Sequence, residues 1–350
     1  MSPKKTLVRL MNSSPSAPAS LPQAEKGRPQ QFEPVDVVTV GETMGLIKET
    51  VTGRLDPQCV SGFGGAESNV MTQLSRLGHS VRWISALGDD RFGSRIRQGL
   101  TVEGVQVVCG DNHGKNTGVM VKTYAGDQDP AVTYYRKESA ASHLGFIDIP
   151  SEAIATAGII HLTGIFPALS PRSLKTTMQV LETARESSLH ISFDVNYRPA
   201  LWDRAQARAT LPLLASYANI IFGSRDELEL LEEVASNPDD RELLTALSAN
   251  ERLVVLKRGS QGAAALAEGS FFECKAWPAT VLDTVGAGDA FVGGFLSQYL
   301  EGATTGDCLS VATYCGAMVC EKLGDWEGQP LRSDLVANGL IPASRTEVIS

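Results

Sequence analysis

The sequence predicts an α/β fold with a mostly parallel central sheet and helices on both faces of that sheet. Short apolar runs rich in β-branched residues alternate along the chain with segments whose apolar residues recur at helical spacing. This alternation is typical of a parallel sheet whose strands are joined by helices. Glycine and polar residues gather just after the predicted strands, where ligands bind in open sheets of this kind.

The first half of the chain predicts strands and helices of the main sheet, and then a break in the pattern. In order, we expect a strand at 35–40, a helix at 66–77, a strand at 81–87, a helix at 92–100 and a strand at 105–108. Residues 118–124 and 131–136 then alternate around a Gly-Asp-Gln-Asp-Pro turn, which predicts a hairpin. A second alternating segment near 46–60 can pair with it. We therefore expect a small projecting sheet formed by residues 46–60 and 117–136.

The alternation resumes in the second half, where Ser170 is the expected N-cap of a helix. The expected elements are a strand at 158–162, a helix at 171–187, strands at 189–193 and 220–222, helices at 225–235 and 239–249, a strand at 253–256, a hairpin at 262–274, and helices at 289–298 and 305–322.

The composition limits the classes of protein that the chain can belong to. Residues 1–34 are rich in Ser, Pro, Gln and Lys and predict a disordered tail, followed by a folded domain at 35–335 and a C-terminal tail at 336–350. The net charge of −9 argues against nucleic-acid binding, and no long apolar run predicts a membrane span. Six scattered cysteines and the lack of a secretory signal indicate reduced thiols in a cytoplasmic protein.

A glycine-rich turn near the C-terminal end is the strongest candidate for a site. Gly286, Ala287, Gly288 and Asp289 precede an apolar helical segment, so the free N–H groups of the first helical turn can face an anion. An aspartate at that turn can accept a proton from a hydroxyl that attacks a phosphate. The alternative is an ordinary glycine-rich loop in which Asp289 caps the helix.

Other nucleotide and metal motifs are absent from the sequence. The chain has no P-loop pattern, and a possible dinucleotide fingerprint that begins at Gly62 has Glu67 at its last glycine position. The five histidines show no zinc-ligand spacing.

Two long motifs resemble the signatures of the ribokinase (PfkB-type) carbohydrate kinases. Residues 283–291, Asp-Thr-Val-Gly-Ala-Gly-Asp-Ala-Phe, resemble the C-terminal signature, and residues 64–69 with 76–78 and 87–93 resemble the N-terminal one. The resemblance covers about residues 35–330. It implies a ribokinase-like three-layer sandwich with a β-sheet lid, Asp289 as catalytic base, and an anion hole made by the backbone of residues 286–288.

The same resemblance implies further site residues and ligands. Three residues correspond to the sugar-binding turn, although they could simply form a tight strand-to-helix turn: Gly64, Gly65 and Asn69. Nucleotide contacts are implied for Ser224, Lys257, Gly259, Gly262, Gly286 and Gly288, with a plain hairpin turn as the alternative for 257–262. Glu227 is expected to support Mg²⁺ through water, while Ser224 stands where many members have Asn. The family implies ATP as co-substrate, K⁺ as a candidate activating ion, and a homo-oligomer, a dimer or larger, formed through the lid.

Two arginines indicate an anionic sugar. Tyr134 and Arg136 lie two apart on a predicted strand and so face one side, where they can bind a carboxylate or form a solvated lid face. Arg198 lies in residues 193–202, at the carboxyl end of the predicted strand at 189–193, where the alternative is a salt-bridged strand exit. This stretch and the Tyr-Tyr-Arg segment are similar to those of 2-keto-3-deoxygluconate kinases. Residues 324–328 depart from the small-residue stretch that is usual in the family.

The predicted function is ATP-dependent phosphorylation of a sugar acid hydroxyl, converting 2-keto-3-deoxygluconate to its 6-phosphate. A fructokinase and a 5-dehydro-2-deoxygluconokinase are the alternatives within the family. A non-catalytic sugar-binding homologue is the alternative outside enzymes, and the intact Asp289 with its glycine turn argues against it.

Overall fold

The structure is a computed structural model that describes residues 31–49, 58–123, 131–232, 238–248 and 252–343. Residues from Phe32 onward form one compact unit, and the description below concerns that unit alone. The predicted N-terminal tail lies outside the described residues except for its last four, 31–34. Residues 344–350 of the predicted C-terminal tail also lie outside them.

The main sheet has nine strands in the order β13-β12-β11-β10-β9-β8-β1-β4-β5. Its strands are β1 (Val35–Val40), β4 (Val81–Ser85), β5 (Gln106–Cys109), β8 (Ala157–Thr163), β9 (His190–Asp194), β10 (Ile220–Gly223), β11 (Leu253–Lys257), β12 (Ala263–Ala267) and β13 (Ser270–Cys274). All neighbours from β11 to β5 pair in parallel, while β12 and β13 form an antiparallel hairpin at one edge. The prediction of a mostly parallel sheet is confirmed.

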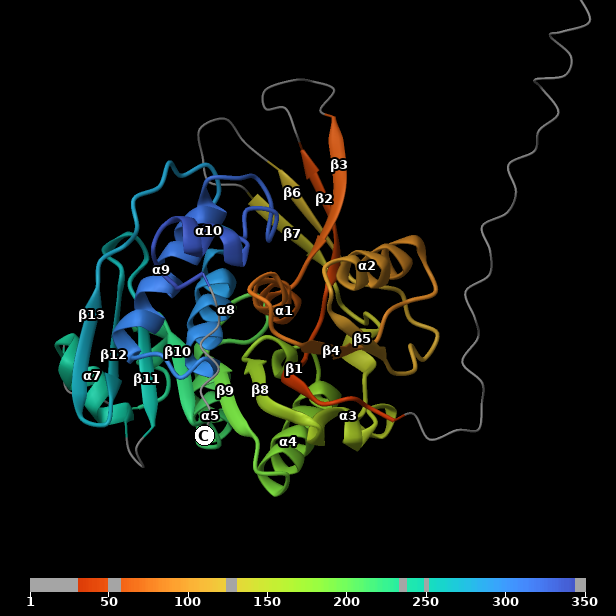
Figure 1. The fold of residues 1–350 in the computed structure, drawn as a ribbon. Coiled ribbons are helices and arrows are strands. Elements are labelled where there is room, and N and C mark those ends of the chain that lie inside the picture. The colour runs from red at the N-terminus through yellow and green to blue at the C-terminus, as the bar shows by residue number, and fades with distance from the viewer. Residues whose placement is uncertain (1–30, 50–57, 124–130, 233–237, 249–251, 344–350) are drawn as a thin grey trace, which may run out of the picture. The chain divides into compact units, whose positions relative to one another are not determined.

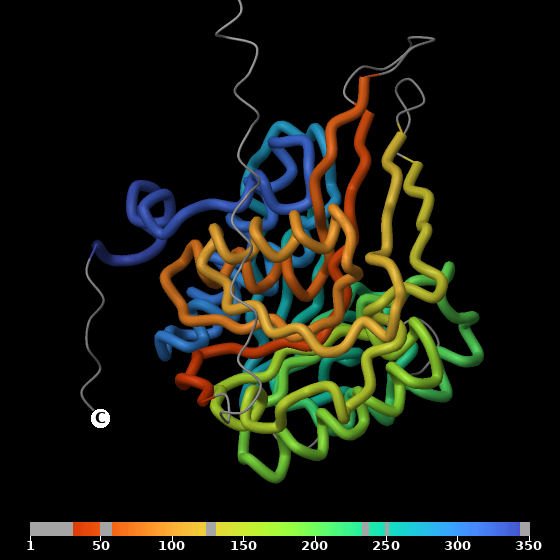
Figure 2. The backbone as a smooth tube through the Cα atoms, turned by 90° about the vertical axis from the view of Figure 1, so that its right-hand side faces the viewer, coloured from red at the N-terminus to blue at the C-terminus, as the bar shows by residue number. Residues whose placement is uncertain are grey.

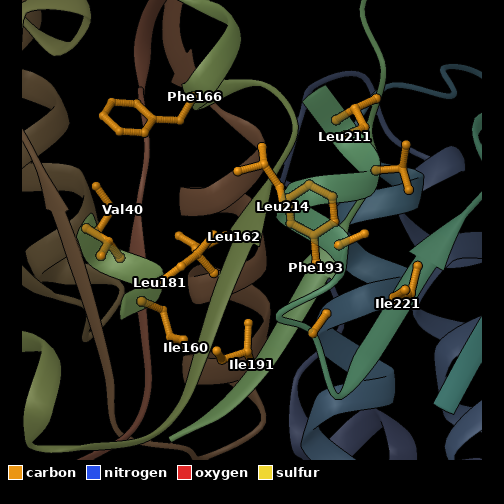
Figure 3. Packing of buried hydrophobic residues seen from close by; sticks show 14 of the residues in the cluster. Val40, Ile160, Leu162, Phe166, Leu181, Ile191, Phe193, Leu211, Leu214 and Ile221 are labelled. Carbon is orange, nitrogen blue, oxygen red and sulfur yellow. The ribbon is translucent and has the colours of Figure 1, made fainter. Parts of the chain in front are cut away.

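Helices cover both faces of this sheet, as Figures 1 and 2 show. One layer contains α1 (Ala66–Arg76), α2 (Arg91–Val102), α8 (Ala287–Leu300) and α9 (Thr305–Cys320), and the other contains α3 (Ser151–Ala155), α4 (Pro171–Glu186), α5 (Arg204–Ala215), α6 (Arg225–Leu228) and α7 (Asp240–Leu247). Each layer seals its own cluster of buried apolar side chains against the sheet. Figure 3 shows part of the second layer's cluster, which includes Leu181 and Leu211 of the helices and Ile160 and Phe193 of the strands.

A second, four-stranded sheet forms the lid, and Figure 1 shows it projecting from the main sheet. Its order is β3-β2-β6-β7, with β2 (Met44–Glu49), β3 (Cys59–Gly64), β6 (Val119–Thr123) and β7 (Ala131–Tyr135). The predicted β6–β7 hairpin is confirmed, and β2 joins it by pairing in parallel with β6. The tips of both hairpins lie outside the described residues. The inner face of the lid is apolar because alternate residues share one side of a strand: Met44, Leu46 and Met120 are buried together.

The main differences from the predicted elements lie at helices α5, α6 and α10, and the short helix α3 was also not predicted. Helix α6 ends at Leu228, whereas the sequence predicted a helix to residue 235. The spacing of Leu228, Leu230 and Leu231 suggested a longer amphipathic helix, but these leucines are buried from a single helical turn and the loop that follows it. Helix α5 was not predicted, since Pro212 interrupts its sequence. Helix α10 (Arg332–Ala337) crosses the boundary expected at residue 335, and Ile341 beyond it packs in the same cluster as Leu335.

Candidate active site

A cavity of about 980 Å³ lies between the lid and the carboxyl ends of the main strands, and it contains most of the predicted site residues. The predicted residues that line it are Gly64, Gly65, Asn69, Tyr134, Arg136, Arg198, Glu227, Lys257, Gly286, Gly288 and Asp289. Four others do not line it: Ala287, Ser224, Gly259 and Gly262. Segments from both ends of the chain therefore meet here, as the sequence motifs require.

The glycine turn presents the start of helix α8 to this cavity. Gly286 is the N-cap of α8 and has φ 80°, in the left-handed region that favours glycine. A Cβ at Gly286 would also lie only 1.7 Å from the backbone oxygen of Asp325. At Gly288 the nearest atom to an added Cβ is Nζ of Lys257, at 3.8 Å. The free N–H groups of the helix start thus face a space that also has an ammonium group nearby, which suits a phosphate.

Asp289 of the C-terminal glycine motif contacts Asn69 of the N-terminal glycine motif. It lies in the first turn of α8, is 9% exposed, and accepts a hydrogen bond from Nδ2 of Asn69 at 2.8 Å. Burial raises the pKa of Asp289 to about 6, while the Asn69 amide and the nearby Arg198 oppose that rise. A carboxylate with such a pKa can accept a proton near neutral pH.

A lysine and two carboxylates occupy the strand ends beside the turn. Nζ of Lys257 lies 2.7 Å from both carboxylate oxygens of Asp194. Glu227 accepts hydrogen bonds from the backbone N–H groups of Tyr197 and Ser224, at 3.0 and 2.7 Å. Burial disfavours the ionised Glu227, but Lys257 and Ser224 hold its pKa below its usual value.

The structure provides one carboxylate suited to an indirect metal contact. Glu227 lines the cavity and is ionised, and each of its oxygens keeps a lone pair beyond the backbone N–H that it accepts. In the described part of the chain, no three His, Cys, Asp or Glu side chains gather to hold a metal directly. Mg²⁺ commonly binds to one or two carboxylates, water and substrate phosphates, so these residues fit it.

Arg136 forms an ion pair with Glu42, a contact that the sequence did not predict. Its Nη2 and Nε lie 2.5 and 2.7 Å from Oε2 of Glu42, and the hydroxyl of Ser139 donates to Oε1 of the same carboxylate. Glu42 follows strand β1 of the main sheet and Arg136 follows β7 of the lid. This ion pair therefore fastens the base of the lid to the core, and it places a carboxylate directly against the guanidinium of Arg136.

Arg198 differs from Arg136 because its side chain is exposed at the cavity and makes no hydrogen bond or ion pair with other residues in the described ranges. It follows β9, two residues after Asn196, which is buried at φ 38° and also lines the cavity. Asparagine tolerates this left-handed conformation better than most residues. The guanidinium of Arg198 is thus available to a ligand.

Asp325 is a cavity residue that the sequence analysis missed. Its Oδ1 is buried without a hydrogen-bond partner, and an added Cβ at Gly64 would lie 2.1 Å from its Oδ2. Burial raises the pKa of Asp325 to about 7, opposed by Lys122. Its segment, residues 324–328, was noted only as a departure from the family pattern, and that departure was the available signal.

These features are typical of a kinase that acts on small molecules: a cavity under a β-sheet lid and a glycine turn at the start of a helix. Comparison of the sequence with known protein families identifies the family. The pattern of the pfkB family carbohydrate kinases matches residues 35–331, so this chain belongs to that family.

Individual relatives agree with this assignment. The chain is 37% identical to a 2-dehydro-3-deoxygluconokinase of Bacillus subtilis, over 89% of this chain and 97% of that protein. It is 29% identical to a 2-dehydro-3-deoxygalactonokinase of Haloferax volcanii, over 83% and 92%. A crystal structure of a PfkB protein from Polaromonas sp. JS666 superposes with a TM-score of 0.76 at 32% identity, covering 87% of this chain and 99% of that one. Across the described residues, no helix has the length and apolar character needed to span a bilayer.

Proposed function

We propose that this carbohydrate kinase transfers the γ-phosphoryl group of ATP to a hydroxyl of a sugar acid, 2-keto-3-deoxygluconate, and forms its 6-phosphate. The observation that carries the proposal is Arg198, an exposed guanidinium without a partner in the described chain, on the wall of the cavity that holds Asp289. A planar guanidinium matches a carboxylate by two parallel hydrogen bonds. The names of the two relatives, both kinases of 2-dehydro-3-deoxy sugar acids, support the same class of substrate.

Asp289 is proposed to accept the proton of the attacking hydroxyl. Burial keeps its carboxylate basic enough for this, and the amide of Asn69 holds the oxygen in place by a 2.8 Å hydrogen bond. The hydroxyl then attacks the γ-phosphorus in line, the bond to the leaving oxygen of ADP breaks, and the proton stays on Asp289. The sugar therefore has to bind with this hydroxyl between Asp289 and the phosphate.

The glycine turn is proposed to stabilise the charge that develops on the transferred group. Gly286 and Gly288 line the cavity at the start of α8, and the N–H of Ala287 between them donates to the backbone oxygen of Thr284 at 3.3 Å. Fixed donors at a helix start need no rearrangement during the reaction. Lys257 adds a positive charge close to Gly288. Mg²⁺, held through water by Glu227 and by the phosphates, would neutralise part of the nucleotide charge. Ser224, Gly259 and Gly262 remain proposed nucleotide contacts outside this cavity.

The acceptor end is proposed to recognise the sugar acid by several groups. Arg198 binds the carboxylate, and Arg136, positioned by Glu42, offers its remaining N–H groups beside Tyr134. Gly64, Gly65 and Asn69 let the sugar approach closely, and Asp325 accepts a hydrogen bond from one of its hydroxyls. Two lid tyrosines are exposed, Tyr134 by 44% and Tyr135 by 66%, so we extend the proposal to a dimer that forms through the lid.

An ADP-release assay over a panel of acceptors tests the substrate. We expect high kcat/KM with 2-keto-3-deoxygluconate, lower values with its galactonate epimer and with 5-dehydro-2-deoxygluconate, and little activity with fructose. The position of the phosphate is read by NMR of the product. If only neutral sugars are phosphorylated, the carboxylate role of Arg198 is wrong. If 5-dehydro-2-deoxygluconate is preferred, the acid recognition stands and the particular sugar is wrong.

A further inference from the structure

A buried ion pair connects the lid directly to the glycine turn. The ammonium of Lys122, on lid strand β6, donates a hydrogen bond to Oδ2 of Asp283, three residues before Gly286. The side chains are 1% and 0% exposed. The partners are 161 residues apart in the sequence and belong to different sheets and loops. None of the roles proposed above for the reaction uses this pair.

Asp283 uses its carboxylate to shape the turn. Its Oδ1 accepts a hydrogen bond from the backbone N–H of Val285 at 3.2 Å, and its Oδ2 accepts a longer one from Gly324 at 3.4 Å. The first bond folds the chain immediately before Gly286, as aspartate commonly does in turns. The second joins the turn to the segment that contains Asp325. The position of this one carboxylate therefore affects the backbone N–H groups that face the phosphate.

Lys122 reaches Asp283 because of its place in the lid. Residues 120 and 122 of β6 point to the same side, so Lys122 extends the buried inner face that begins with Met120. Lys48 is its neighbour on β2, and Nζ of Lys48 donates to the backbone oxygen of Leu323 at 3.1 Å. Lid lysines thus reach the core at two adjacent points, but only Lys122 is paired with a carboxylate of the glycine turn.

A buried charge that loses its partner is strongly unfavourable. When the lid lies on the core, Lys122 compensates the charge of Asp283. When the lid moves away, Asp283 remains close to Asp325, a further acidic group, without the ammonium. The conformation of the glycine turn and the position of the lid are therefore energetically coupled, because the same ion pair depends on both.

We propose that Lys122 is a positioning residue for phosphoryl transfer, which holds the Gly286–Gly288 turn in its working geometry through Asp283 only when the lid is seated. This inference rests on the kinase reaction proposed above and adds a requirement to it. Lid closure would then complete the anion-binding turn as well as exclude water. A phosphate bound under an open lid would meet a turn that is not yet in position.

The test compares Lys122→Met, Lys122→Arg and a control, Lys115→Met. Lys115 pairs with Glu138 at 3.0 Å on the surface, so its replacement removes a lysine–carboxylate pair outside the cavity. We expect Lys122→Met to lower kcat by about 10²-fold, as misplacement of a reacting group does, with little change in KM for the sugar. Lys122→Arg should recover most of kcat, and Lys115→Met should leave both constants unchanged. A folded Lys122→Met enzyme with normal kcat would overturn the inference.

A double variant separates positioning from simple charge balance. Lys122→Met with Asp283→Asn leaves no uncompensated charge, so we expect its melting temperature to recover while kcat stays low. Recovery of kcat together with the melting temperature would overturn the inference. The double variant also serves if Lys122→Met alone does not fold.

Amide hydrogen exchange makes the outcome independent of the substrate assignment. In Lys122→Met, or in the double variant, we expect faster exchange in residues 119–123 and 283–288, and no change in Lys115→Met. Unchanged exchange in those segments would count against the coupling. If the wild-type protein phosphorylates no sugar at all, the proposed function fails, whereas the exchange measurement still decides whether lid and turn are linked.

Discussion

The two ends of the cavity are built in different ways. The phosphoryl end consists of backbone N–H groups and a buried carboxylate at the start of one helix, at Gly286, Gly288 and Asp289. The acceptor end consists of side chains from the lid and from strand-end loops, above all Arg136 and Arg198. Backbone groups cannot be changed by substitution without changing the fold, while side chains can. We therefore expect the first end to determine phosphoryl transfer and the second end to determine which sugar is accepted.

The two arginines show the same contrast within the acceptor end. Arg136 is bound by the buried carboxylate of Glu42 and helps to anchor the lid, while Arg198 is exposed at the cavity. Arg136 therefore combines an anchoring contact with its proposed contact to the sugar, while the side chain of Arg198 is available to the substrate alone.

Replacing the base should have the largest effect and should not depend on the sugar. We expect Asp289→Asn to lower kcat by about 10²–10⁴-fold, because the amide cannot accept the proton that general-base catalysis removes. The loss should be the same for each sugar that the wild type accepts, and calorimetric binding of the sugar should be nearly unchanged. Steady-state kinetics with two acceptors measure it. A loss confined to one acceptor would show that the two ends are not separable.

Replacing the arginines should have a smaller and sugar-dependent effect. We expect Arg198→Gln to lower kcat/KM for the sugar acid by about 10–150-fold, the worth of a hydrogen bond to a charged group, with no change for a neutral sugar and no loss of stability. Arg136→Gln leaves Glu42 buried without its partner, so it should lower the free energy of unfolding by about 3–5 kcal/mol. Urea denaturation and kinetics on both variants distinguish them. Equal stability losses would remove the distinction between the two arginines.

The pH dependence should show the smallest effect, at the phosphoryl end. Since Asp289 must be ionised to accept a proton, kcat/KM should fall as the pH drops through about 6. The Asn69 amide donates to the ionised carboxylate and so lowers its pKa, and Asn69→Leu should move this acidic limb to higher pH. Asn112→Ala, on an exposed loop, is the matched control. If the acidic limb of the pH profile stays at the same pH in Asn69→Leu, the limb reports the ionisation of another group, such as Asp325.

The fold was largely predictable because its signals are local. Alternating apolar runs, caps such as Ser170 and glycines after helices each depend on a few neighbouring residues, and the nine-stranded sheet and the lid hairpin agree with them. The exceptions follow the same logic. Helix α5 contains Pro212, and the short α6 is followed by leucines that are buried for tertiary reasons, so the local pattern gave a wrong boundary or no signal.

The site was predictable where a motif places residues next to each other in the sequence. The contacts that were missed join residues far apart in the sequence: Glu42 with Arg136, and Lys122 with Asp283. A glutamate after a strand, or a lysine in a lid, carries no pattern that identifies its partner. The sequence could therefore name Arg136 as a candidate but could not show that a carboxylate of the core already holds it.

The contact between Gly286 and Asp325 has a consequence for how the enzyme is made. The cavity wall that contains the glycine turn is complete only when the segment around residue 325, close to the C-terminal end of the chain, lies against it. While that segment is still in the exit tunnel of the ribosome, the nascent chain already contains both signature motifs and Asp289. It nevertheless lacks a finished pocket, so this polypeptide should gain the ability to consume ATP only after the segment around residue 325 has left the tunnel and folded against the turn.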